Sequence, residues 1–98
     1  MLAPMIARIA ELEKLPADLE PHYVALQRAF IAGQPGFCGG YHLLEAETGR
    51  ALSVTMWESD DALAAAQRAM RAGQAPADGR ISRQSNPTVR VVHVEAVF

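Results

Sequence analysis

Cysteine and long apolar runs are nearly absent from this chain of 98 residues. The single cysteine, Cys38, excludes a disulfide framework within the chain. No stretch reaches the roughly 20 consecutive apolar residues that a membrane-spanning helix needs. No charged and then apolar leader precedes the first periodic segment. We therefore expect a reducing, cytoplasmic compartment and no membrane partner.

The chain also lacks clusters of positive charge. Its 9 Lys and Arg against 11 Asp and Glu give a formal net charge of -2. A basic patch is the usual electrostatic footprint of nucleic-acid binding, so the sequence predicts no nucleic-acid partner. Half of the residues are apolar, which is enough for the core of one domain over 1–98. A chain of this length buries only a modest share of its surface, so a partner subunit would add stability.

Hydrophobic periodicity predicts a strand over 5–10 and then a helix over about 18–32. Asp18 is a suitable N-cap, and Gly33 is a suitable residue to end the last turn. One apolar stripe repeats along this helix, while Gln27 and Arg28 are expected to point elsewhere. The stripe is formed by Leu19, Tyr23, Leu26 and Phe30.

A hairpin and a second helix follow. Strand-forming residues over 37–44 and 51–57 flank a turn at Glu47-Thr48-Gly49. Ser59 is a suitable N-cap for an alanine-rich helix that runs to about Ala72. The hairpin therefore separates the two predicted helices.

The end of the chain completes an α+β pattern. The segment 73–87 has no period, and we expect a loop that could close over a ligand as a lid. Alternating valines over 88–98 predict a last strand. The order β-α-β-β-α-β is that of a ferredoxin-like fold, with helices on one face of an antiparallel sheet. Because both sides of strand 51–57 are largely apolar, we expect a homodimer in which two sheets pack face to face.

The most specific pattern covers residues 35–59, Pro-Gly-Phe-Cys-Gly-Gly through Trp-Glu-Ser. This stretch resembles the core of the antibiotic biosynthesis monooxygenase-like family. In that family of dimeric α+β barrels, Pro-Gly-Phe-x-Gly opens one strand and Trp-Glu-Ser closes the next. The resemblance implies a cavity in each subunit between the sheet and its helices. It marks a fold, and folds of this type host several functions.

The resemblance implies a cofactor-independent monooxygenase for a small aromatic quinol, anthrone or polyketide-like substrate. Such an enzyme needs an apolar pocket, a hydrogen-bond donor and a proton acceptor. The haem-degrading branch is expected to add an asparagine in the first strand and a ligating histidine after the second helix. Residues 1–10 contain no asparagine and residues 59–87 no histidine, so we do not expect the haem-degrading branch. The resemblance implies that the quinol-oxidising branch uses no metal or flavin, and the histidines and Cys38 lack metal-ligand spacing, so we expect no cofactor and no metal. The alternative is a non-catalytic module of the same fold, for small-molecule binding or dimerisation.

Three residues are candidate catalytic groups. Trp57 stands where the resemblance implies a tryptophan beside the cavity, and its indole could stack on an aromatic ligand or simply pack in the core. His93 lies among valines and could accept a proton near neutral pH, or be satisfied in the core or the dimer interface. His42 is the third candidate, on strand 37–44.

The candidate substrate-binding residues are Tyr23 and Phe30 on the first helix and Phe37 and Tyr41 on the second strand. Strict alternation along strand 37–44 places Tyr41 on one face with Phe37, and His42 on the other. Only one of Tyr41 and His42 can then line a cavity, and the sequence leaves the choice open. A lone thiol such as Cys38 is most simply an inert small residue.

Overall fold

The computed structural model describes residues 5–12, 20–72 and 88–98. Within them the element order is the one expected from the sequence. The predicted N-cap at Asp18 and the predicted loop over 73–87 lie outside the described residues. The elements are β1 (Met5–Leu12), α1 (Glu20–Ala29), the 3-10 turn η1 (Ile31–Gly33), β2 (Phe37–Leu44), β3 (Ala51–Trp57), α2 (Asp60–Arg71) and β4 (Thr88–Val94).

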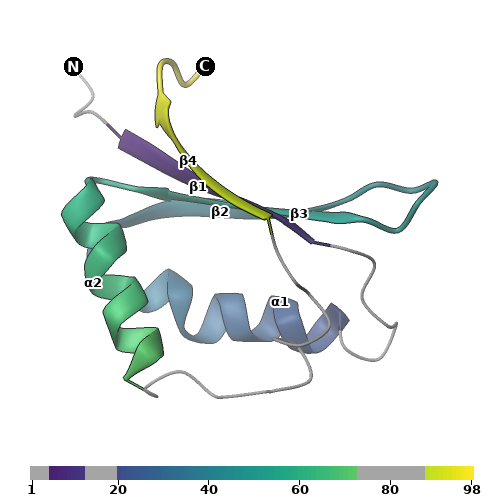
Figure 1. The fold of residues 1–98 in the computed structure, drawn as a ribbon, viewed down its shortest axis with the longest axis horizontal. Coiled ribbons are helices and arrows are strands. Elements are labelled where there is room, and N and C mark those ends of the chain that lie inside the picture. Colours follow the sequence, from purple (N-terminus) through teal and green to yellow (C-terminus); the bar gives the residue numbers. More distant parts are fainter. Residues whose placement is uncertain (1–4, 13–19, 73–87) are drawn as a thin grey trace.

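The four strands form one antiparallel sheet in the order β2-β3-β1-β4. This order and the helix placement confirm the predicted ferredoxin-like α+β fold. Figure 1 shows α1 and α2 on the same side of the sheet, and we call that side the inner face. The opposite side, the outer face, carries no described helix. None of the described helices is both long and apolar enough to cross a membrane.

A β-bulge interrupts the start of β2. Phe37 pairs with Trp57, yet Gly39 pairs with Met56, the next residue along β3. One residue of β2, Cys38, is therefore extra in this part of the ladder. An extra residue of this kind reverses the alternation of side chains beyond it.

The bulge corrects the expected faces of β2. Gly40 lies on the inner face with Phe37, because a Cβ added at Gly40 would lie 3.4 Å from Phe37 Cζ. His42, two residues further, shares that face, and Tyr41 turns to the outer face with 62% of its surface exposed. The prediction that Tyr41 shares a face with Phe37 is wrong, because strict alternation assumes an unbroken ladder.

The main core lies between the sheet and α2. Trp57 is 1% exposed and packs edge-on against Phe37, with ring centroids 5.4 Å apart and an interplanar angle of 79°. Its indole Nε1 donates a hydrogen bond of 2.9 Å to Thr55 Oγ1. The other buried residues of this cluster are Ile6, Ile31, Leu63 and Ala66.

The two helices end differently from each other. The first is shorter than predicted: α1 ends at Ala29, and a separate 3-10 turn follows instead of a continuous helix to residue 32. The cap of that turn is Gln34, whose backbone N–H donates to Ile31 O, so the predicted stop at Gly33 falls inside the turn. The N-cap of α2 is confirmed, since Ser59 Oγ accepts a hydrogen bond of 3.1 Å from the backbone N–H of Ala62.

Candidate functional site

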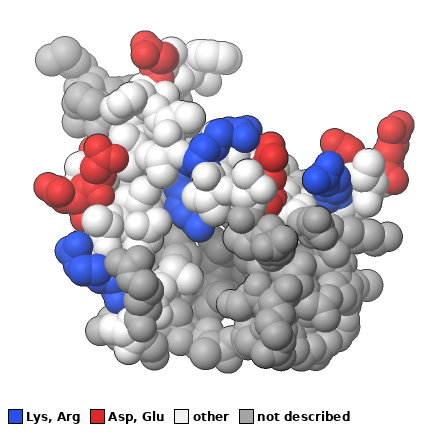
Figure 2. All heavy atoms as spheres, in the orientation of Figure 1, with Lys and Arg blue, Asp and Glu red and all other residues white. Residues whose placement is uncertain are grey.

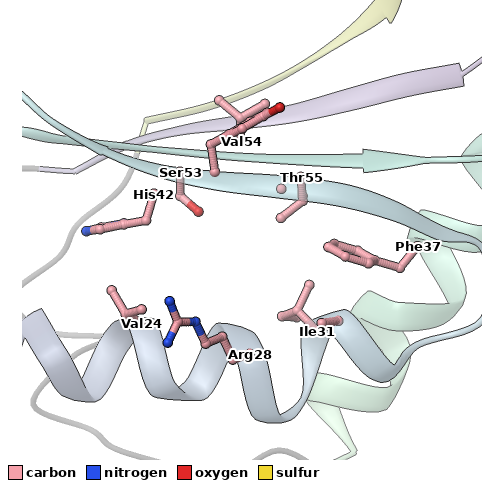
Figure 3. Close-up of a pocket in the computed structure, with 11 residues that line it drawn as sticks. Val24, Arg28, Ile31, Phe37, His42, Ser53, Val54 and Thr55 are labelled. Carbon is pink, nitrogen blue, oxygen red and sulfur yellow. The ribbon is translucent and has the colours of Figure 1, made fainter.

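The inner face of the sheet changes from large to small side chains along its strands. At the α2 end, Trp57 and its paired neighbours Ile6 and Phe37 fill the space above the strands. Further along, Ser53 pairs with Ala10, and Gly40 has no side chain. A cavity of about 360 Å³ therefore remains between this part of the sheet and α1 (Figure 3).

The cavity has a helical wall and a sheet wall. Figure 3 shows Val24 and Arg28 of α1 and Ile31 of η1 directed toward the sheet. From the sheet, His42 and Ser53 are directed toward α1. The remaining lining residues are Ala32, Phe37, Gly40, Tyr41, Val54 and Thr55.

The polar groups of the cavity are few. Ser53 and Thr55 are buried hydroxyl residues, 3% and 7% exposed. Thr55 Oγ1 already accepts the hydrogen bond from Trp57, whereas His42 and Arg28 bring ring and guanidinium nitrogens to the wall. Among the described residues no three His, Cys, Asp or Glu side chains gather as metal ligands. The cavity combines an apolar wall with a basic side chain and an imidazole, as ligand sites commonly do.

The three predicted catalytic residues lie in three different environments. His42 lines the cavity. Trp57 is sealed in the core next to the cavity and is not part of its lining. His93 is exposed on the edge strand β4, where it pairs with Ile6. Because Ile6 stands between them, His93 and Trp57 are two strand spacings apart, roughly 9–10 Å.

The predicted substrate-binding residues also lie in different environments. Phe37 lines the cavity, and Phe30 is half-buried against the core cluster. Tyr41 borders the cavity from its strand but lies on the outer face, largely exposed. Tyr23 lies on α1, and its side chain is outside the described part of the structure. The sequence could not decide whether Tyr41 or His42 lies on the inner face, and the structure places His42 there.

Sequence reasoning missed Arg28 as a cavity residue. The sequence predicts that Arg28 points away from the apolar stripe of the helix. In the structure Arg28 lines the cavity together with Val24 and Ile31. Arg28 follows Val24 by four residues and precedes Ile31 by three, which is the spacing of one helix face. The spacing of Val24, Arg28 and Ile31 is therefore a signal in the sequence, although the more apolar stripe through Phe30 lies on the neighbouring face of the helix.

The fold and the cavity define a small ferredoxin-like α+β protein with a ligand-sized space between its sheet and its first helix. Solved structures share this fold over nearly the whole chain. SnoaB, a cofactor-independent oxygenase from Streptomyces nogalater, is 18% identical with a TM-score of 0.66, covering 96% of this chain and 94% of that one. The heme-degrader MhuD from Mycobacterium tuberculosis, solved with two hemes in its active site, is 23% identical with a TM-score of 0.66, covering 95% and 98%.

A third similar structure carries the family description itself. It is a proposed antibiotic biosynthesis monooxygenase from Bordetella bronchiseptica, 21% identical with a TM-score of 0.64, covering 96% of this chain and 98% of that one. The chain thus has the antibiotic biosynthesis monooxygenase-like fold that its sequence predicted. No family sequence model matches the chain, and no curated protein shows significant sequence similarity to it.

Proposed function

We propose that this protein is a cofactor-independent monooxygenase that oxidises a small aromatic substrate of the quinol or anthrone type. The observation that carries the proposal is the cavity of about 360 Å³ between α1 and the sheet, with His42 in its wall. Ligand pockets commonly measure about 300–1,000 Å³ and combine apolar walls with a few polar groups. The shared fold with SnoaB, a cofactor-independent oxygenase, supports the same reading.

The chemistry asks little of the protein beyond binding and proton transfer. The imidazole of His42 accepts a proton from the substrate, and the resulting carbanion or phenolate gives electrons to O2. For an anthrone, the carbon binds O2 as a hydroperoxide, which loses water and leaves a carbonyl. One oxygen atom enters the product and the other leaves as water, so no further reductant is needed. Ile31 and Phe37 exclude water from the anion.

The lining residues do not fit a haem group. A haem in a protein is held by an axial ligand such as a histidine. The imidazole that lines the described cavity, His42, lies between α1 and the sheet, where Val24 and Arg28 face it across the cavity (Figure 3). A ligand on His42 would be confined between the sheet and these helical side chains, and no step of the proposed reaction involves haem.

Oxygen uptake by the purified protein with a panel of anthrones and hydroquinones tests the proposal. We expect uptake above the uncatalysed rate, and a loss of about 10²-fold or more in His42→Gln, because a positioned proton acceptor contributes that much. His93→Gln serves as the matched control, since His93 is exposed outside the cavity, and its rate is expected to stay near wild type. Uptake that is equal in His42→Gln and wild type would contradict the assignment of the base.

The second candidate function is binding of a small apolar molecule without turnover. Trp57 favours it: the residue that the family resemblance places beside the substrate is sealed in the core, 1% exposed. Ligand binding detected by calorimetry, without oxygen uptake for any compound of the panel, would identify this second function. Absence of both would leave a scaffold of the same fold.

The outer face supports a homodimer as the functional unit. Its exposed or half-buried side chains are mostly apolar, and Figure 1 shows no helix over them. Closed two-fold dimers are the commonest oligomers of small proteins, and they place one patch against its own copy. An apolar sheet face of this kind is stabilised by a second sheet. The apolar residues of the outer face include Ala7, Ile9, Tyr41, Leu43, Leu52, Val54, Met56 and Val92, and the exposed ion pair of Glu11 and Arg90 lies on the same face.

Two substitutions on β2 test the dimer. Tyr41→Asp places a charge on the outer face and is expected to convert a dimer to a monomer at micromolar concentration, because a buried unpaired carboxylate is costly. Leu44→Asp is the control, on the same strand and similarly exposed, 54% against 62% for Tyr41, but on the opposite face. Light scattering measures the mass of each. A wild-type protein that is monomeric at tens of micromolar would rule out this interface.

A further inference from the structure

We infer that the cavity binds an organic carboxylate, with the anionic group held by Arg28 on the side of Ser53 and the apolar body against Ile31 and Phe37. The inference rests on the proposed function in that it names the substrate class of the same cavity. The inference concerns binding alone, so a binding measurement tests it whether or not the protein oxidises the ligand.

The two ends of the cavity differ in chemistry. At one end, Figure 3 shows His42 and Ser53 extending from the sheet and Arg28 extending toward them from α1. At the other end Ile31 and Phe37 approach each other from opposite walls. A ligand complementary to both ends has a polar group on one side and an apolar, ring-sized body on the other.

The polar end of the cavity carries a positive charge. A guanidinium is always charged, and no Asp or Glu is among the described residues that line the cavity. Within the described part of the chain, Arg28 has no ion pair and no side-chain hydrogen bond. The planar guanidinium matches a carboxylate, which accepts two parallel N–H bonds. An anion of that shape would therefore complement this end of the cavity.

A second guanidinium stands on the same face of the sheet. Arg8 pairs with Thr55 in the β1–β3 ladder, so it lies one strand away from the cavity wall. The Nε atom of Arg8 is buried and has no hydrogen-bond partner among the described residues. A buried donor without an acceptor is destabilising, and an anion at the neighbouring end of the cavity would favour this charge as well.

The positive character is local to the cavity. The whole chain carries a formal net charge of -2, and the described basic and acidic side chains are interspersed on the surface that Figure 2 shows. A net negative charge gives the chain as a whole no general attraction for anions. Discrimination of an acid from its neutral analogue is expected to depend on Arg28, which lines the helical wall of the cavity opposite Ser53.

Calorimetric titration with an anthraquinone carboxylate and its isosteric carboxamide tests the inference. We expect the wild-type protein to bind the carboxylate about tenfold or more tightly than the carboxamide, because charge-assisted hydrogen bonds are the stronger ones. In Arg28→Gln the preference should fall to within about threefold, while the affinity for the carboxamide stays unchanged. Arg28→Lys keeps the positive charge but loses the planar pair of N–H donors, so this variant should retain part of the preference for the carboxylate.

Arg68→Gln is the matched control, because it removes an exposed arginine from α2 outside the cavity and should leave the preference intact. Equal affinity for the two probes, a preference that survives Arg28→Gln, or binding of neither probe would each overturn the inference. Neutral quinols oxidised by a protein that shows no preference would leave the proposed oxidation standing alone. A carboxylate preference without any oxygen uptake would leave the binding site standing without the oxidation.

Discussion

Gly36→Ala is expected to destabilise the protein by about 3 kcal/mol, because the added methyl group causes both backbone strain and a steric clash. Gly36 has φ of 82°, a left-handed conformation that residues with a Cβ adopt at a cost of about 1–2 kcal/mol. An added Cβ would also lie 2.5 Å from Ala62 Cβ on α2. The backbone cannot move aside freely, since Gly36 O accepts a 2.9 Å hydrogen bond from Glu58 N.

Gly33→Ala provides the control three residues earlier. An added Cβ at Gly33 meets nothing within 4 Å, so the substitution is expected to be neutral or to stabilise by up to about 1 kcal/mol. Urea denaturation at one fixed protein concentration measures both variants, because association would make the midpoint concentration-dependent. A Gly36→Ala variant within about 1 kcal/mol of wild type would show that the turn relaxes around the methyl group.

Much of the fold could be predicted because its signals are local. The hairpin strands match the predicted ranges 37–44 and 51–57, and Ser59 caps α2 as expected. These features depend on alternation and on side chains that bond to nearby backbone groups. The end of α1 was harder to predict: α1 stops at Ala29, although Phe30 continues the apolar stripe and keeps a right-handed backbone with φ of -113° and ψ of -56°. Phe30 also packs against the core cluster, a tertiary contact that the local pattern does not encode.

The candidate site was predictable only in part. Phe37 and His42 both line the cavity, but the predicted alternation had placed them on opposite faces. The difference comes from one extra residue, Cys38, between two partners that are adjacent on β3. Nothing in the side-chain pattern of Phe-Cys-Gly-Gly distinguishes a bulge from a regular strand. The cavity itself depends on small residues from different strands, such as Ala10 and Ser53, that only the pairing brings together.

Trp57→Ala is expected to destabilise the protein by about 3–5 kcal/mol, the usual cost of removing a large buried side chain. Trp57 is 1% exposed, and its ring supports Phe37, which forms one wall of the cavity. Loss of activity in this variant would therefore report a collapsed wall. It would say nothing about catalysis by the indole, and a smaller change is needed for that.

Trp57→Phe separates packing from chemistry, because it keeps most of the ring volume and removes the indole N–H. The partner of that N–H is Thr55 Oγ1, at 2.9 Å, so Thr55→Val removes the same hydrogen bond from its other side. If the bond is structural, each single variant costs about 1 kcal/mol or more and the double variant costs less than their sum. Oxidation rates of the folded variants should then follow those of Thr55→Val. A fall of about 10²-fold in Trp57→Phe alone, at unchanged stability and ligand affinity, would instead make Trp57 a catalytic residue, as the sequence predicts.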